Sequence, residues 1–165
     1  MAEYSHIKRT FGPVWAADSK ILILGSFPSV KSREANFYYG HPQNRFWRVM
    51  ARVLDCTVPE SVEEKREMLL SHGMALWDVL EECDIAGSSD SSIRNAVPVD
   101  IMAVLRAADI REIYCNGTTA YSLFTRYLSP VCGREAVKLP STSPANAVWS
   151  FDRLCGAWEI IKDKA

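Results

Sequence analysis

The 165-residue sequence lacks the motifs of several common enzyme classes. It has no G-x-G-x-x-G after its first apolar run and no G-x-x-x-x-G-K-[ST], which excludes the usual dinucleotide and phosphate-loop sites. It has no G-x-S-x-G elbow, and no histidine accompanies a serine or cysteine in a pattern typical of acyl transfer. No apolar run approaches the roughly 18 residues that span a membrane, and the first residues lack the apolar stretch of a signal peptide. We therefore expect a protein that works where it is made, without a membrane partner.

Paired cysteines are missing as well. No two cysteines form a C-x-x-C pair, and the three histidines make no pair at helical spacing, so the spacing of a zinc or iron–sulfur site is absent. We expect free thiols in a reducing compartment, which favours the cytoplasm (the nucleoid in a prokaryote), and neither a metal nor a cofactor. The cysteines are Cys56, Cys83, Cys115, Cys132 and Cys155.

Net charge gives little sign of a partner, because 19 Lys and Arg oppose 20 Asp and Glu. The distribution is uneven. Residues 1–55 carry eight basic and four acidic side chains, residues 111–165 carry seven and five, and residues 56–110 carry four and eleven. If folding brings the two ends together, they can form a basic face that attracts an anionic partner.

Short apolar runs alternate with amphipathic segments along the chain. Residues 20–25 (KILILG) form a continuous apolar run that ends at a glycine, which is typical of a strand buried on both faces of a parallel sheet. The alternation predicts one α/β domain over residues 1–165, a three-layer α/β/α sandwich with a central, mainly parallel four-stranded sheet and an irregular lead-in at residues 1–19. The other expected strands are 74–79, 110–115 and 137–139, and the expected helices are 44–54, 61–72, 100–107, 118–128 and one from about 151.

Three segments follow the expected strands and carry the candidate site. They are residues 25–44, 116–119 and 140–146, and they are rich in amides, hydroxyls and aromatic rings. Ligands of parallel sheets bind beyond the carboxyl ends of the strands, so these segments are expected to meet around a ligand. Their side chains suit a planar heterocycle and a phosphate better than an acyl group.

The same segments resemble the motifs of a known family in order along the chain. Residues 25–29 (GSFPS) and 37–47 (FYYGHPQNRFW) resemble the first signature of the uracil/mismatch DNA glycosylase superfamily. Residues 115–117 (CNG) resemble its central strand end, and residues 141–146 (STSPAN) its second, DNA-inserting loop. Within the superfamily the motifs look most like the hypoxanthine-DNA glycosylase branch. The resemblance implies an enzyme that flips a deaminated base out of double-stranded DNA and hydrolyses its glycosidic bond.

Two departures from the family pattern concern catalysis. Phe27 stands where the classical uracil branch has a water-activating aspartate and the mismatch branch an asparagine, and the second loop has no histidine. The resemblance implies that Asn44 takes over as the catalytic residue, since an amide can position a water for attack on an oxocarbenium-like sugar. An alternative role for Asn44 is to cap the helix that follows it.

The remaining candidate residues divide between the base and the DNA backbone. Asn116 is expected to read one edge of the flipped base, or else to serve as a turn residue before Gly117. Phe27 is expected to stack on the base, with Tyr38 or Tyr39 closing the pocket. The expected DNA contacts are Ser26, Pro28, Ser29, Ser141, Thr142, Ser143, Pro144, Ala145 and Asn146.

Four charged residues near the motifs have two possible roles each. Lys31, Arg33 and Arg45 contact phosphates or lie solvated at the surface. Asp78, in the run LWDVL, bonds to the backbone or takes part in catalysis.

Three functions stay open at this point. The first is a monofunctional glycosylase for hypoxanthine, which acts as a monomer on double-stranded DNA. The second is a uracil/mismatch-specific glycosylase. The third is a non-catalytic lesion- or nucleotide-binding domain, which gains support from the missing aspartate and histidine.

Overall fold

A four-stranded parallel sheet lies at the centre of the protein. The computed structural model describes residues 3–163, so residues 1–2 and 164–165 of the predicted domain lie outside the described part. The sheet has the order β3-β2-β6-β7, and every neighbouring pair is parallel. This confirms the predicted sheet. Its strands are β2 (Ile21–Gly25), β3 (Met74–Asp78), β6 (Glu112–Asn116) and β7 (Val137–Leu139).

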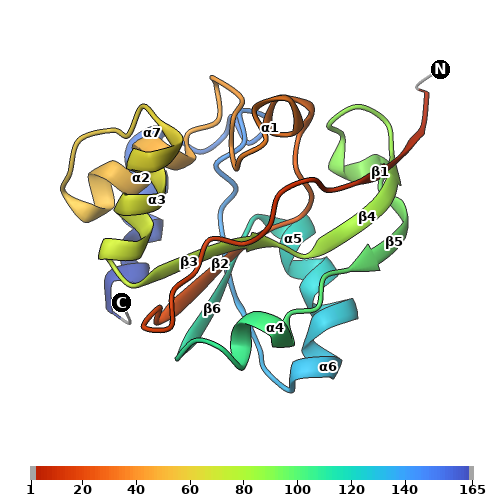
Figure 1. Ribbon diagram of the computed structural model, residues 1–165. Coiled ribbons are helices and arrows are strands. Elements are labelled where there is room, and N and C mark those ends of the chain that lie inside the picture. Colours follow the sequence, from red (N-terminus) through yellow and green to blue (C-terminus); the bar gives the residue numbers. More distant parts are fainter. Residues whose placement is uncertain (1–2, 164–165) are drawn as a thin grey trace.

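Helices cover both faces of this sheet, as a three-layer sandwich requires (Figure 1). One face carries α2 (Phe46–Leu54), α3 (Val62–Ser71) and α7 (Phe151–Trp158), and the other carries α5 (Thr118–Leu123). Among residues 3–163, every helix is too short or too polar to cross a bilayer. The shorter elements are α1 (Val30–Ala35), α4 (Met102–Leu105), α6 (Ser129–Cys132), the π-helix η2 (Phe124–Leu128), and the 3-10 helices η1 (Asp90–Ser92) and η3 (Glu159–Asp163).

The register of the sheet brings three strand ends to one edge. Strand β2 is fully buried between β3 and β6, which explains its unbroken apolar sequence. Gly25, its last residue, lies opposite Asp78 of β3, and Cys115 of β6 lies opposite Leu24. The side chains that follow these positions are therefore held close together at the carboxyl edge.

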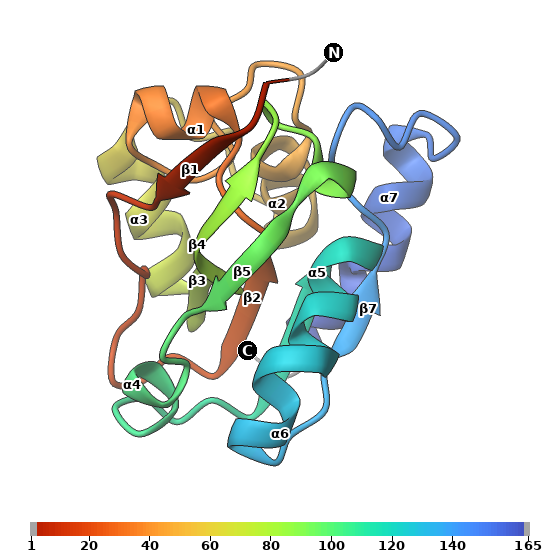
Figure 2. The same ribbon diagram turned by 90° about the vertical axis from the view of Figure 1, so that its right-hand side faces the viewer.

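A second, antiparallel sheet was not expected from the sequence. Its order is β1-β4-β5, formed by β1 (Ser5–Lys8), β4 (Leu80–Ile85) and β5 (Arg94–Pro98), and Figure 2 shows it in front of the central sheet. Strand β1 differs from the irregular lead-in expected at residues 1–19. Its residues are mostly exposed and polar, so backbone pairing with β4 holds it without leaving an apolar pattern in the sequence.

A buried ion pair joins the two sheets. Arg9, just after β1, lies with Nη1 3.1 Å from Oδ2 of Asp78, and both side chains are almost fully buried. The guanidinium also donates from Nη2 to Tyr38 Oη and from Nε to the carbonyl of Phe11. Burial raises the pKa of the Asp78 carboxyl, and the charge of Arg9 opposes that rise. Asp78 therefore has a structural role, but its partner is the Arg9 guanidinium and not the backbone that was expected.

We predict that Arg9→Met strongly destabilises the protein, because it leaves the Asp78 carboxyl buried without its cation. Breaking a buried pair in this way costs about 3–5 kcal/mol of unfolding free energy. Equilibrium urea unfolding measures the loss. Arg111→Met is the control, because Arg111 pairs with Asp109 at the surface and its loss should hardly move the midpoint. Equal shifts in the two variants would contradict the role assigned to the buried pair.

Candidate active site

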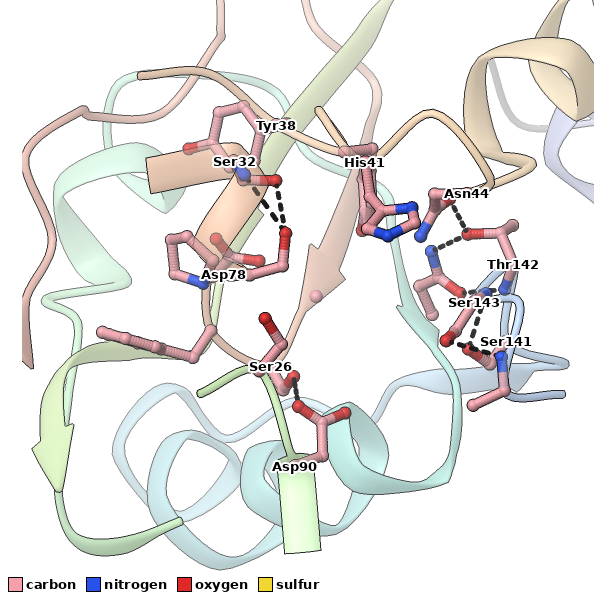
Figure 3. A pocket seen from close by; sticks show the side chains of 18 of the residues that line it. Ser26, Ser32, Tyr38, His41, Asn44, Asp78, Asp90, Ser141, Thr142 and Ser143 are labelled. Carbon is pink, nitrogen blue, oxygen red and sulfur yellow. Dashed lines mark hydrogen bonds between the residues drawn. The ribbon is translucent and has the colours of Figure 1, made fainter. Parts of the chain in front are cut away.

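A cavity of about 320 Å³ opens at the carboxyl edge of the central sheet (Figure 3). Gly25, Asp78 and Asn116 end β2, β3 and β6, and all three line it. The rest of the lining comes from Phe11 after β1, from the segment after β2, from the turn between β4 and β5, and from the loop after β7. Its volume is near the lower end of the usual range for ligand pockets, about 300–1,000 Å³, which suits a single heterocycle.

The residues predicted from the three motifs meet in this cavity. Phe27, Asn44 and Asn116 come from separate segments, and all line it. Asn146 is an exception, because it is not part of the lining and its Nδ2 donates to the carbonyl of Ser141. The other predicted residues in the lining are Ser26, Pro28, Ser29, Tyr38, Tyr39, Ser141, Thr142, Ser143, Pro144 and Ala145.

Thr142 connects the two asparagines. Its hydroxyl accepts a hydrogen bond from Asn116 Nδ2 at 3.0 Å and donates to Asn44 Oδ1 at 2.9 Å. Its backbone N–H donates to Asn116 Oδ1 at 3.0 Å. The residue is fully buried, so its hydroxyl cannot reach a DNA phosphate. The structure therefore places Thr142 differently from the expected DNA contact, as a bridge inside the protein (Figure 3).

Asn44 both bonds to the start of a helix and faces the cavity. The N-cap of α2 is Arg45 and not Asn44, but Phe46, the first residue of the helix, donates its N–H to Asn44 Oδ1 at 2.9 Å. The same oxygen accepts the Thr142 hydroxyl. Two donors occupy the carbonyl oxygen, and the amide NH₂ makes no hydrogen bond with the residues that the structure describes. The NH₂ group is thus the part of Asn44 available to a ligand or a water.

The two tyrosines differ in their surroundings. Tyr38 donates to the carbonyl of Gly12 and accepts from Arg9, so its hydroxyl belongs to the core. Tyr39 stacks on Phe46 with ring centres 4.1 Å apart, and its buried hydroxyl has no hydrogen-bond partner within residues 3–163. Burial raises the pKa of Tyr39, and the nearby Asp78 charge adds to the rise, so the hydroxyl keeps its proton. Of the two, Tyr39 is better placed to contact a bound ring.

Two ionisable residues, Asp90 and His41, also line the cavity and were not singled out in the sequence. Asp90 accepts a hydrogen bond from the Ser26 hydroxyl at 2.9 Å, and burial raises the pKa of its carboxyl. His41 accepts the N–H of Gln43 at Nδ1, which leaves Nε2 to carry the proton of the neutral ring. Asp90 lies in a polar turn, and only the fold of the second sheet brings it to the site.

The basic residues near the motifs bond mainly within the protein. Lys31 forms an exposed pair with Glu34. Arg33 donates to the carbonyls of Pro28 and Gly87, and Arg45 donates to three carbonyls of the loop after β7. Internal carbonyls thus occupy Arg33 and Arg45, whereas Lys31 lies at the surface, as one of its two expected roles has it.

We predict that Gly25→Ala destabilises the protein, because a Cβ atom there would meet the Asp78 carboxylate and lie 2.9 Å from Tyr39 Oη. Overpacking of this kind costs about 1–3 kcal/mol. Urea unfolding measures the loss, with Gly12→Ala as control, because no atom lies within 4 Å of a Cβ placed there. A stability of Gly25→Ala equal to that of the control would show that the Asp78 and Tyr39 side chains do not fill this space.

Comparison with known proteins gives consistent matches over most of the chain. The family profile described as the Uracil DNA glycosylase superfamily matches residues 13–163. A protein of Methanosarcina acetivorans named Hypoxanthine DNA glycosylase is 34% identical over 159 residues, which cover 94% of this chain and 98% of the relative. A protein of the same name from Methanosarcina barkeri is 30% identical, with 94% and 98% of the two chains covered.

The fold is also similar to a solved structure. A solution NMR structure from Methanosarcina acetivorans, provisionally named a uracil DNA glycosylase, superimposes with a TM-score of 0.80 at 32% sequence identity. The superposition covers 94% of this chain and 97% of that one. The profile match and the identities over nearly full length lead to one conclusion. The chain belongs to the uracil DNA glycosylase superfamily.

Proposed function

We propose that the chain is a monofunctional DNA glycosylase that removes hypoxanthine from deoxyinosine in double-stranded DNA. The observation that carries the proposal is the meeting of Phe27, Asn44 and Asn116 around one cavity of nucleobase size. The two relatives named Hypoxanthine DNA glycosylase support this choice of base. We further propose that the protein acts as a monomer in the cytoplasm or nucleoid.

The Asn116 amide is suited to read the edge of hypoxanthine. One Nδ2 hydrogen and one Oδ1 lone pair bond to Thr142, which fixes the plane of the amide. Thr142 binds both atoms on the shared edge of the amide, so the remaining hydrogen and the remaining lone pair point to opposite sides. The remaining hydrogen can donate to O6 of hypoxanthine while the bonds to Thr142 stay in place. Adenine carries an amino group in place of O6, so the remaining N–H donor opposes its binding. Phe27 and Tyr39 supply aromatic faces for stacking.

Hydrolysis requires a held water and a site that tolerates positive charge on the sugar. The bond between C1′ and N9 breaks with its electron pair leaving on the base, the water oxygen bonds to C1′, and a water proton ends on the base. Asn44 can hold the water through its free NH₂ group. The Asp90 carboxylate, when ionised, adds negative charge to the same cavity. None of the lining residues is a lysine, so an imine intermediate and strand cleavage are not expected.

Uracil is the second candidate base. The NMR structure that superimposes on this chain is provisionally named a uracil DNA glycosylase, and the family carries the same name. Uracil presents O4 and N3–H in the arrangement that hypoxanthine presents with O6 and N1–H, so Asn116 can read either base.

Base release from defined duplexes tests the proposal. Duplexes that carry a single inosine, uracil or xanthine are incubated with the protein, and alkali then reveals abasic sites. We expect the highest rate with inosine and no cleavage without alkali. A higher rate with uracil would move the activity to the second candidate. Binding without release of any base would support a non-catalytic lesion-binding protein instead.

We predict that Asn44→Ala lowers the rate of base release by about tenfold or more, because the attacking water loses a hydrogen-bond partner. Single-turnover rates on the inosine duplex measure the effect, and thermal unfolding confirms that the variant is folded. A rate close to that of the wild type would remove Asn44 from the mechanism.

We predict that Thr142→Val lowers the rate by about tenfold, because both asparagine side chains lose the hydroxyl that orients them. Thr142→Ser keeps the hydroxyl and should retain most of the activity. The comparison separates the hydrogen bonds from the packing of the buried side chain. Equal losses in the two variants would mean that packing, and not the bridge, sets the rate.

A further inference from the structure

Two consecutive turns give the loop after β7 its shape. The N–H of Asn146 donates to the carbonyl of Ser143, and the N–H of Trp149 donates to the carbonyl of Asn146. The turns therefore share Asn146. The carbonyls of Ser143, Asn146 and Trp149 mark the start, junction and end of this double turn.

All three of these carbonyls bind one guanidinium. Arg45 donates from Nη2 to the carbonyls of Ser143 and Asn146, each at 3.1 Å, and from Nη1 to the carbonyl of Trp149 at 2.5 Å. Its backbone N–H donates to the carbonyl of Thr142 at 3.0 Å. A guanidinium carries five donors in a fixed plane, so one side chain can hold several carbonyls in a defined arrangement. Arg45 is therefore the hub around which residues 142–149 are arranged.

The double turn turns its carbonyls inward and its apolar side chains outward. Pro144 and Ala145 lie at the first turn and Ala147 and Val148 at the second, and all four are exposed. Val148 is 75% exposed, more than any other large apolar residue within residues 3–163. Pro144 and Ala145 also line the cavity, so the first turn stands at its mouth. A rigid apolar projection beside a base-sized cavity suits insertion into a stack of bases.

We propose that Arg45 is a positioning residue that preforms this double turn as the wedge filling the space left by an extruded base. The inference rests on the proposed function. Because the three carbonyls occupy its guanidinium, Arg45 contributes through the loop and not through a phosphate contact. Without the Arg45 side chain, the turns keep their two backbone bonds and the Asn146 bond to Ser141. They lose the guanidinium that binds the three carbonyls together.

The wedge matters most where a base must leave a duplex. In double-stranded DNA, extrusion breaks stacking and pairing, and the inserted loop compensates for part of that loss. In single-stranded DNA the base is already largely free, so the same loop contributes little. Loss of Arg45 should therefore change the ratio of the rates on the two substrates, whereas damage to the cavity would lower both rates alike.

The test compares Arg45→Gln with Arg48→Gln on one inosine oligonucleotide, used single-stranded and as a duplex. Arg48 lies in the first turn of α2, three residues after Arg45, and is exposed. It makes no hydrogen bond with the loop in the described part of the chain, so its variant loses the same charge and keeps the bonds of Arg45. We expect Arg45→Gln to lower the duplex to single-strand rate ratio by about tenfold or more, and Arg48→Gln to leave the ratio unchanged. Arg45→Lys should fall between, because an ammonium cannot hold three carbonyls in a plane. An unchanged ratio in Arg45→Gln, or equal loss on both substrates, would overturn the proposal.

A second readout keeps this test independent of the proposed activity. Hydrogen exchange at the amides of Asn146 and Trp149 reports the double turn directly. Both amides should exchange faster in Arg45→Gln and as in the wild type in Arg48→Gln. Unchanged protection of these two amides in Arg45→Gln would contradict the claim that Arg45 holds the double turn. If the wild type released hypoxanthine from neither substrate, the proposed function would fail while the exchange result still decided the role of Arg45.

Discussion

The buried hydroxyl of Thr142 is the contact on which the arrangement of the site depends. It joins Asn116, at the end of a central strand, to Asn44, at the start of a helix 98 residues earlier in the chain than Thr142. Asn44 also accepts the N–H of Phe46 in its own segment, and the Thr142 hydroxyl is what links it to Asn116. A fully buried hydroxyl that both donates and accepts leaves little rotational freedom to either amide. The two side chains expected to act on one base are therefore linked through a single residue.

Neighbouring contacts extend this arrangement into the loop after β7. Asn44 and Arg45 are adjacent in sequence, and each binds the loop after β7: Asn44 through the Thr142 hydroxyl, Arg45 through its backbone and its guanidinium. The cavity and the projecting double turn are thus parts of one structure. On the opposite wall, the buried pair of Arg9 and Asp78 joins the second sheet to the strand end that faces Gly25. The cavity proposed to bind the base and the loop proposed to contact DNA are then held by the same set of buried contacts.

Local patterns predicted the central sheet and the segments that form the site, but not the partners within it. The unbroken apolar run of β2 revealed a strand covered on both faces, and strand-end motifs placed Phe27, Asn44 and Asn116 at one edge. The bridge by Thr142 and the hub at Arg45 join residues about a hundred positions apart, which no local periodicity encodes. The second sheet was not predicted, because a mostly exposed, polar strand such as β1 leaves no apolar pattern in the sequence. For the same reason the position of Asp90 beside Ser26 was not predicted.

A crystal structure of the Asn44→Ala variant bound to a duplex with one deoxyinosine would test the central claim most directly. The account predicts hypoxanthine inside the cavity, stacked on Phe27, with its O6 at the Asn116 amide and with Asn116 still bonded to Thr142. A base that stays stacked within the duplex, or that binds away from Phe27 and Asn116, would contradict the account.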